Sequence, residues 1–355
     1  MLKDNINLVV DIECEIYHLI RHFPHKKFYD FSTETIVPGS VYIVSREQFK
    51  NNVAKIREHI DQAHFVLSNP AEASETIKRM CAELYGVDDL FLNNKLAMIS
   101  GGDIETGWAN LKFEKFITLI REERTNIESV GRSNEIYSKI VKPYKFLFLN
   151  GRARYHRIEM IKRLAPLLQQ ALWTNLDTAA GPIHFLPQEY EITSCHKHMV
   201  ESGARFEKPN LFQGKNWADG IIKADPYIDT YFSVVTETVF EYPYSFRTEK
   251  IWKPIAMAHP WICCSNYGFY RDIKNLGFKT FAHLIDESFD TIYSTQDRLA
   301  RLEHVIKDLC TQDLPSFLAA AEDTCKYNQS HMRELVPKII SQFPQQFTDF
   351  INERY

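Results

Sequence analysis

The sequence predicts an α/β protein made of two Rossmann-like domains followed by a helical C-terminal tail. Short apolar runs rich in β-branched residues alternate with segments whose apolar residues recur at helical spacing, as in repeated strand–helix units. These runs show no polar alternation, which is typical of parallel strands covered on both faces. At 355 residues the chain is long for a single core and has room for two domains of ordinary size.

The first half of the chain contains four expected strands and two expected helices. The strands are expected at residues 6–12, 41–45, 64–67 and 96–100, and the helices at 47–62 and 74–85. Ser74 is a suitable N-cap for the second helix, and Gly86 is a suitable stop. Strands that alternate with helices in this way imply a parallel sheet with helices on both faces.

The domain boundary is expected where the sequence becomes polar. Residues 112–123 have helical spacing, whereas residues 126–142 are rich in polar side chains. We therefore expect a first domain at residues 1–140 and a second at residues 141–315.

The second domain is expected to repeat the strand–helix pattern. Its strands are expected at residues 144–149, 231–235 and 261–264, and its helices at 158–168, 251–257 and 297–309. Residues 316–355 form the tail, which should break at Pro337 or Pro344 because proline lacks the amide donor of a helix interior. We expect this tail to pack back on the first domain.

The overall composition limits the classes of function. The hydrophobic content of 45% and charged content of 25% are those of a folded protein. A formal net charge of −4 and a pI near 6.4 argue against a broad nucleic-acid-binding face, so nucleic acid is not an expected partner. No window approaches the ~20 apolar residues of a membrane span. We expect a cytoplasmic protein, or one injected into a host cytosol if it comes from a pathogen.

The cysteines and histidines do not form a recognisable metal site. The seven cysteines include no C-x-x-C pair and read as buried free thiols of a reducing compartment. Cys195, His196 and His198 lie close together in the sequence but lack a fourth ligand at a suitable spacing. The sequence therefore predicts no metal. Residues 217–220 are interpreted as a lid or an acceptor-facing loop.

A corner suited to a nucleotide is expected after a buried strand of the second domain. Glu237 follows this strand, and Thr248 caps a helix that begins beside Arg247 and Lys250. A helix N-terminus with an adjacent lysine suits a diphosphate. Glu249 has the acceptor oxygens that two vicinal ribose hydroxyls require. The alternative is an ordinary capped helix whose first-turn charges are solvated.

A second candidate corner follows the strand at residues 144–149. Asn150 comes directly after it, and Arg152, Arg154 and Arg157 lie at the start of the next helix. Arginine is permanently charged and binds phosphate through two parallel hydrogen bonds. The alternative is a solvated basic first turn, although cations are unfavourable at a helix N-terminus unless an anion offsets them.

These two corners resemble the α-1,3/1,4-fucosyltransferase family. The TEKIW segment at residues 248–252 and the strand that ends in Glu237 are similar to conserved segments of that family, and the resemblance spans about residues 231–281. Asn150 and Arg157 are similar to its upstream donor loop, with Arg154 as the competing arginine. The family has the GT-B architecture, in which two Rossmann-like domains face each other across a cleft. Two residues differ from its pattern: they are Ser245 and Phe246.

The resemblance implies a glycosyltransferase that needs no metal or other cofactor. Such an enzyme transfers a sugar, such as fucose from GDP-fucose, from a nucleotide-sugar to a hydroxyl of a glycan or protein, with inversion. The donor would bind the second domain and the acceptor the first. One alternative is a catalytically inactive nucleotide- or glycan-binding protein of the same fold. A Rossmann oxidoreductase or methyltransferase is disfavoured because no G-x-G-x-x-G follows a strand.

The catalytic base is expected in the first domain, because the resemblance places the acceptor there. An inverting transfer needs a carboxylate within reach of the acceptor hydroxyl. Asp103 follows the strand at residues 96–100 in a Ser-Gly-Gly-Asp loop and is the preferred candidate, with Glu13 second. Glu72 and Glu75 suit helix capping better. The alternative is that Asp103 is an ordinary turn residue.

Overall fold

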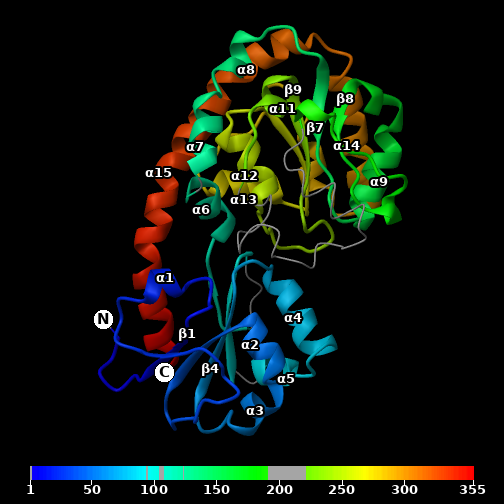
Figure 1. Cartoon of the computed structure of the whole chain (residues 1–355). Coiled ribbons are helices and arrows are strands. Elements are labelled where there is room, and N and C mark those ends of the chain that lie inside the picture. Colours follow the sequence, from blue (N-terminus) through cyan, green and yellow to red (C-terminus); the bar gives the residue numbers. More distant parts are fainter. Residues whose placement is uncertain (1, 93–94, 104–107, 123, 191–220) are drawn as a thin grey trace. The chain divides into compact units, whose positions relative to one another are not determined.

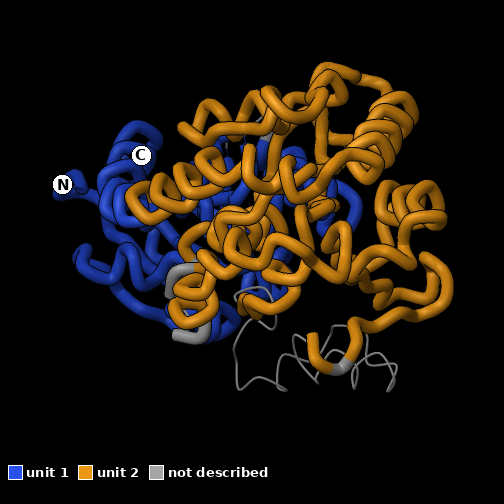
Figure 2. The backbone as a smooth tube through the Cα atoms, turned by 90° about the horizontal axis from the view of Figure 1, so that it is seen from above, with its two compact units in different colours: residues 1–115, 336–355 blue, residues 116–335 orange. Residues whose placement is uncertain are grey.

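The computed structural model describes residues 2–92, 95–103, 108–122, 124–190 and 221–355. The chain forms two compact units, one of residues 1–115 with 336–355 and the other of residues 116–335 (Figure 2). These units part earlier in the chain than the predicted boundary near residue 140. The assignment of an acceptor side and a donor side to them stays a prediction.

The first unit is built on a parallel sheet with the strand order β2-β1-β3-β4-β5-β6. Four of its strands were expected, and β3 and β5 have the predicted bounds. The short edge strands β2 and β6 were not predicted. The strands are β1 (Leu8–Asp11), β2 (Lys26–Phe28), β3 (Val41–Ser45), β4 (His64–Asn69), β5 (Leu96–Ser100) and β6 (Asn110–Lys112).

Helices cover both faces of the first sheet. One face packs against α2 (Arg46–Asn51), α3 (Val53–Glu58), α4 (Ser74–Glu83) and α5 (Asp88–Leu92). The other packs against α1 (Tyr17–Ile20) and the last turns of α15 (Leu314–Arg354), as Figure 1 shows. Phe343, Phe347 and Ile351 of α15 are buried in the same apolar cluster as Val10 and Ile43. Burial on both faces explains why these strands carry apolar runs without alternation.

The second unit has a parallel four-stranded sheet with the order β10-β9-β7-β8. Its central strands carry the longest apolar runs, because each is paired on both edges and covered on both faces. The strands are β7 (Tyr144–Phe148), β8 (Ala171–Trp173), β9 (Thr230–Thr236) and β10 (Trp261–Cys264). The predicted α/β class with parallel sheets and a helical C-terminal region is confirmed.

The helices of the second unit lie on opposite sides of its sheet. Figure 1 shows α9 and α14 on one side of the sheet and α12 on the other. The α-helices are α6 (Lys115–Glu122), α7 (Arg124–Gly131), α8 (Glu135–Ser138), α9 (Tyr155–Leu164), α11 (Asp225–Ile228), α12 (Glu249–Ala256), α13 (Phe269–Asn275) and α14 (Thr295–Leu309). Short 3-10 helices are η1 (Ala165–Gln170), η2 (Thr178–Ala180), η3 (Gln188–Tyr190) and η5 (Ser288–Thr291).

The C-terminal helix α15 runs without a break, so the predicted interruption at Pro337 or Pro344 was wrong. Each proline removes one backbone donor from the helix interior. Val336 and Phe343 beside them are fully buried, and this packing holds the helical path. Thr348 also donates its hydroxyl to the carbonyl of Pro344 at 2.9 Å.

Other local predictions were corrected by the structure. The helix expected at residues 47–62 is two short helices, α2 and α3, because Asn52 leaves the helical conformation with φ −129°. Lys112 ends strand β6 instead of starting a helix. Ser74 is the first residue of α4 and not its cap: its hydroxyl donates instead to the carbonyl of Asp103 at 2.9 Å.

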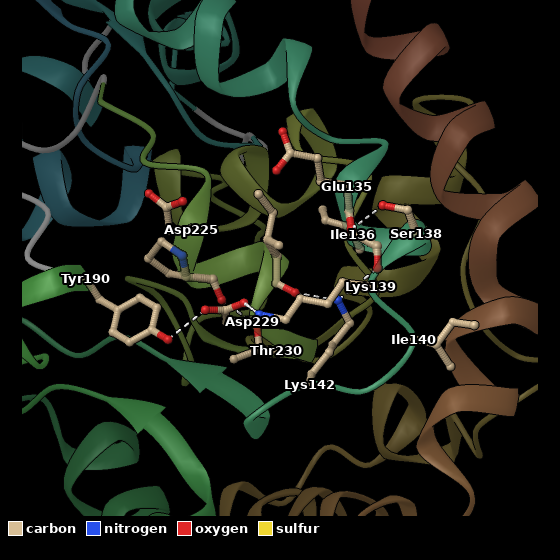
Figure 3. A network of polar contacts seen from close by, with 12 residues as sticks. Glu135, Ile136, Ser138, Lys139, Ile140, Lys142, Tyr190, Asp225, Asp229 and Thr230 are labelled. Carbon is tan, nitrogen blue, oxygen red and sulfur yellow. Dashed lines mark hydrogen bonds and ion pairs between the residues drawn. The ribbon is translucent and has the colours of Figure 1, made fainter.

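A polar network ties together the amino-terminal ends of β7 and β9 (Figure 3). The Lys142 ammonium is buried and donates to the carbonyls of Ile136 and Ile228 at 2.8 and 2.6 Å. Asp229 pairs with Lys139 and accepts a hydrogen bond from the Tyr190 hydroxyl at 2.6 Å. Burial lowers the pKa of Lys142 to about 8. This network lies at the sheet edge opposite the candidate site.

Two further findings concern the described residues only. Six cysteines in this part of the chain are buried free thiols. None of its helices combines the length and apolar character that crossing a bilayer requires.

Candidate functional site

The candidate site lies where the chain reverses its direction across the second sheet. From β7 the chain passes through α9 to β8 on one side, and from β9 it passes through α12 to β10 on the other. The carboxyl ends of β7 and β9 are therefore a topological switch point, where open α/β sheets bind their ligands. Asn150 and Glu237 follow these two strands. The Thr236 hydroxyl joins the strand ends by donating to Asn150 Oδ1 at 2.8 Å.

Asn150 is buried and held from several directions. Its backbone amide donates to Thr174 Oγ1 at 2.8 Å, and that hydroxyl donates back to its carbonyl at 3.1 Å. The side-chain Nδ2 makes no hydrogen bond within the described part of the chain. A buried donor without an acceptor costs about 1–3 kcal/mol, so an oxygen from a ligand would stabilise this amide.

Arg157 is buried beside it and is engaged by backbone carbonyls. Its Nη1 donates to the Arg152 carbonyl at 2.9 Å, and its Nη2 donates to the carbonyls of Thr236 and Glu237 at 3.3 and 3.2 Å. These bonds hold the turn after β7 against the end of β9. Burial, and next the charge of Arg154, lower the pKa of Arg157 to about 10. Only its Nε lacks a partner among the described residues, and its predicted phosphate contact stays a prediction.

The buried imidazole of His156 shares the carbonyl of Glu237 with Arg157. Its Nε2 donates to the Glu237 carbonyl at 2.7 Å. Burial is the main cause that lowers its pKa to about 3, and the charges of Arg157, Arg154 and Lys250 lower it further. His156 is therefore neutral. Arg154 is exposed at the N-cap position of α9.

Glu237 positions the start of α12. Its carboxylate is fully buried and accepts hydrogen bonds from the Thr248 amide at 2.9 Å, the Thr248 hydroxyl at 2.7 Å and the Thr238 amide at 2.9 Å. These contacts are all within the protein. The described contacts of Glu237 therefore support a positioning role, and its predicted role in donor binding stays a prediction.

Thr248 is the N-cap of α12, as predicted, and it accepts a hydrogen bond from the Lys250 amide. The Lys250 ammonium lies beside this cap, 3.0 Å from Thr248 Oγ1 and 2.6 Å from Glu249 Oε1. Burial would raise the pKa of Glu249, but Lys250 and Lys253 outweigh it and hold that pKa below its ordinary value. Glu249 is thus an anion paired to a lysine. Arg247, just before the cap, is almost fully buried.

The two predicted base candidates belong to the first unit. Asp103 is partly buried and forms an ion pair with Lys112, which also contacts Glu114 Oε1 at 2.9 Å. Glu13 is exposed, and its backbone amide donates to the buried carboxylate of Asp11 at 2.9 Å. The same carboxylate accepts from the Ser45 amide, where β1 and β3 form the switch point of the first sheet. Whether Asp103 or Glu13 acts as a base stays a prediction.

Glu114, a buried carboxylate next to Lys112, was not among the predicted site residues. Lys112 was expected in a helix, although the polar–apolar alternation from Asn110 to Phe113 is typical of a strand. If a strand is assigned to these residues, Glu114 follows its carboxyl end. Polar residues at that end of a parallel sheet are candidates for a ligand site.

Other predictions fall outside the described residues. They concern Cys195, His196, His198 and the loop at residues 217–220. In the part of the chain that the structure describes, no group of three or more histidine, cysteine or acidic side chains is arranged to hold a metal ion.

Comparison with known proteins identifies no family. No family model matches the chain, and no curated protein matches it. The resemblance to fucosyltransferases thus rests on short segments of the chain.

Two solved structures show weak similarity to the whole chain. One is the N-terminal domain of trehalose-6-phosphate phosphatase from Candida albicans, with a TM-score of 0.34 and 11% identity over 87% of this chain and 71% of that one. The other is the wall teichoic acid polymerase TagF, with a TM-score of 0.25 and 10% identity over 96% of this chain and 90% of that one. The case for a function therefore rests on this chain's own residues.

Proposed function

We propose that the protein is a glycosyltransferase that uses a nucleotide-sugar donor. The observation that carries this proposal is that the segments after β7 and β9, which supply Arg154, Arg157 and Lys250, meet at the switch point of the second sheet. A diphosphate is the anion that such a corner suits.

The arrangement of the site agrees with binding a leaving diphosphate. The N-termini of α9 and α12 both begin at this edge of the sheet and carry a partial positive charge. Two further donors, Nδ2 of Asn150 and Nε of Arg157, have no hydrogen-bond partner among the residues that the structure describes. Fixed cations and dipoles of this kind stabilise charge that develops on a departing group. In this proposal the transfer needs no metal.

Glu249 would bind the ribose in this proposal. Its carboxylate is ionised, only partly accessible and fixed by Lys250, so it presents acceptor oxygens to a pair of hydroxyls. Fucose as the sugar, GDP as the nucleotide and inversion as the stereochemical course are proposed from the TEKIW resemblance. The acceptor would be a hydroxyl of a glycan or a protein.

Asp103 is the proposed base, with Glu13 as the second candidate. Its carboxylate forms an ion pair with Lys112, which ends strand β6 of the first sheet. An Asp103→Asn variant keeps the shape and removes the charge. Wild-type turnover of this variant at saturating donor and acceptor would exclude Asp103, and Glu13→Gln would then be measured in the same way.

The proposal is tested by incubating the protein with a panel of nucleotide-sugars, with and without glycan acceptors, and measuring nucleoside diphosphate release and product glycan. We expect release with one donor class, and Arg154→Ala and Lys250→Ala should each reduce it at least tenfold, because a charge-assisted hydrogen bond contributes about 1.5–3 kcal/mol. Glu241→Ala, an exposed charge in the loop after β9, is the matched control. Binding of nucleotide without any transfer would favour the inactive binding protein, and no nucleotide binding would refute the proposal.

A further inference from the structure

We propose that Phe240 is a positioning residue for the candidate nucleotide site, because its ring joins two helices to the loop that places Lys250. This inference rests on the proposed function, since the lysine is one of the cations assigned to the diphosphate. The loop comprises residues 237–248, between the end of β9 and the start of α12. Phe240 is only 3% exposed, so its ring is closed to a ligand and its role in binding is indirect.

The ring of Phe240 contacts side chains from two different helices. The imidazole of His156, in the first turn of α9, stacks on it with the ring centroids 5.0 Å apart and the planes 9° from parallel. The guanidinium of Arg298, in the first turn of α14, lies over the same ring, 4.3 Å from its centroid. Offset parallel rings attract each other, and an aromatic face attracts a cation. These contacts therefore join α9 and α14 to the loop.

Hydrogen bonds from the same two side chains hold the backbone of the loop. His156 Nε2 donates to the Glu237 carbonyl at 2.7 Å. Arg298 Nη2 donates to the carbonyl of Phe240 itself at 2.6 Å, and its Nη1 donates to the carbonyl of Tyr293, just before α14, at 3.0 Å. Arg298 is buried, and its fork of donors reaches two separate segments at once. It is thus a link between the loop and the start of α14.

The position of the Lys250 ammonium depends on this loop. Its Nζ lies 3.4 Å from Thr238 Oγ1 and 3.0 Å from Thr248 Oγ1, so it contacts both ends of the loop. The Glu237 carboxylate closes the loop by accepting from the amides of Thr238 and Thr248 at 2.9 Å each. Phe240 lies between these ends in the sequence. A loop that is closed at its ends and held between them presents the ammonium in one place, which reduces the entropy lost when an anion binds.

Burial alone does not require an aromatic ring at this position. A leucine at residue 240 would also be apolar and buried, but it has no aromatic face for the imidazole or the guanidinium. The loop would then be closed at its ends and held less firmly between them. An ordinary core substitution lowers stability and leaves the affinity of the folded protein unchanged, whereas loss of Phe240 should change both.

The test separates affinity from stability. Calorimetry would measure the dissociation constants of GDP and UDP for the wild type, Phe240→Leu and Arg298→Lys at a temperature where all three are folded. A charge-assisted contact changes affinity about 10- to 150-fold, and Phe240→Leu should lose part of it, at least about fivefold for the nucleotide that binds. Arg298→Lys keeps the charge but not the fork of donors, so it should act in the same direction. Phe146→Leu, a buried phenylalanine of β7, is the matched control and should lower the melting temperature without changing affinity.

A double-mutant cycle tests whether Phe240 acts through Lys250. If it does, Phe240→Leu should weaken the nucleotide less than about twofold in a protein that already carries Lys250→Ala. Hydrogen exchange tests the same role without a ligand. The amides of residues 237–250 should exchange faster in Phe240→Leu than in the wild type, and Phe146→Leu should leave the exchange of this segment unchanged. If Phe240→Leu does not fold, Arg298→Lys carries the same measurements.

Each other outcome has a distinct meaning. Wild-type nucleotide affinity in Phe240→Leu and Arg298→Lys, with lowered melting temperatures, would show a purely structural role and overturn the inference, while leaving the proposed function in place. An equal loss of affinity with and without Lys250 would also overturn it, because Phe240 would then act through another group. Unchanged hydrogen exchange in the loop would overturn it as well. If the wild type binds no nucleoside diphosphate, the proposed function fails, and the positioning role fails with it.

Discussion

Replacing Glu237 by alanine should destabilise the second unit, because this carboxylate is a buried anchor for the helix that carries the candidate lysine. The substitution removes the acceptor of three hydrogen bonds, two of them to the amide and hydroxyl of Thr248. A hydrogen bond to a charged group contributes about 1.5–3 kcal/mol. The two bonds to Thr248 are lost in the variant, but the cost of desolvating the buried carboxylate is removed as well. We therefore expect the free energy of unfolding to fall by about 3 kcal/mol.

The assay is urea unfolding followed by tryptophan fluorescence and far-ultraviolet circular dichroism. A loss of about 3 kcal/mol corresponds to a melting temperature lower by roughly 6–12 °C for a domain of this size. Glu241→Ala, an exposed glutamate in the same loop, should change the free energy of unfolding by less than about 0.5 kcal/mol.

A double-mutant cycle tests the contact directly. Thr248→Val removes the hydroxyl that Glu237 accepts, so the two substitutions should be non-additive by about 1 kcal/mol or more. The reasoning is refuted if Glu237→Ala unfolds like the wild type and loses only nucleotide affinity. That result would place Glu237 against the ligand instead of against Thr248.

Three further predictions concern charge and burial. Burial holds the pKa of Lys142 at about 8, below its ordinary value near 10.4. Between these two pH values the unfolded chain binds more protons than the folded chain, so the free energy of unfolding rises with pH. The Lys142→Met variant should lack about 3 kcal/mol of this rise between pH 7 and 10, as measured by urea unfolding at each pH. Burial lowers the pKa of His259 to about 3, so between pH 6.5 and 4 only the unfolded chain takes up a proton at this residue. The free energy of unfolding should therefore fall by about 3 kcal/mol over this range, and it should fall less with pH in the His259→Gln variant. Arg157→Ala should lower the melting temperature by several degrees because three carbonyls lose their donor, whereas Arg154→Ala should retain the wild-type melting temperature and weaken nucleotide binding in calorimetry. Equal melting temperatures for these two variants would contradict the roles assigned to them.

Local sequence was sufficient to predict the central strands and the helix cap of the candidate site. The runs at β7, β9 and β10 are apolar without alternation because each strand is buried on both faces. A strand of this kind has apolar side chains at consecutive positions, so it can be recognised from the sequence alone. Thr248 was predicted as the cap from its own side chain and the helical spacing after it. That the segments after β7 and β9 meet at one end of the sheet also followed, since the carboxyl ends of neighbouring parallel strands lie there.

Only the tertiary structure decided which of these polar groups are buried and what they contact. Arg154 and Arg157 are three residues apart and chemically identical, but one is exposed and the other is engaged by carbonyls of β9, a strand distant in sequence. Glu237 meets Thr248 because a loop returns the chain to the strand end, and no local pattern encodes that return.

The short strands and the C-terminal helix depended on distant partners in the same way. The three-residue strands β2 and β8 are too short to carry a periodic signal and exist because a neighbouring strand supplies their hydrogen bonds. Helix α15 continues through Pro337 and Pro344 because packing of Val336 and Phe343 outweighs the two lost backbone bonds. The sequence of a segment determines its secondary-structure propensity and its apolar pattern. Which polar side chains are buried, and what they contact, is decided only when distant segments pack together.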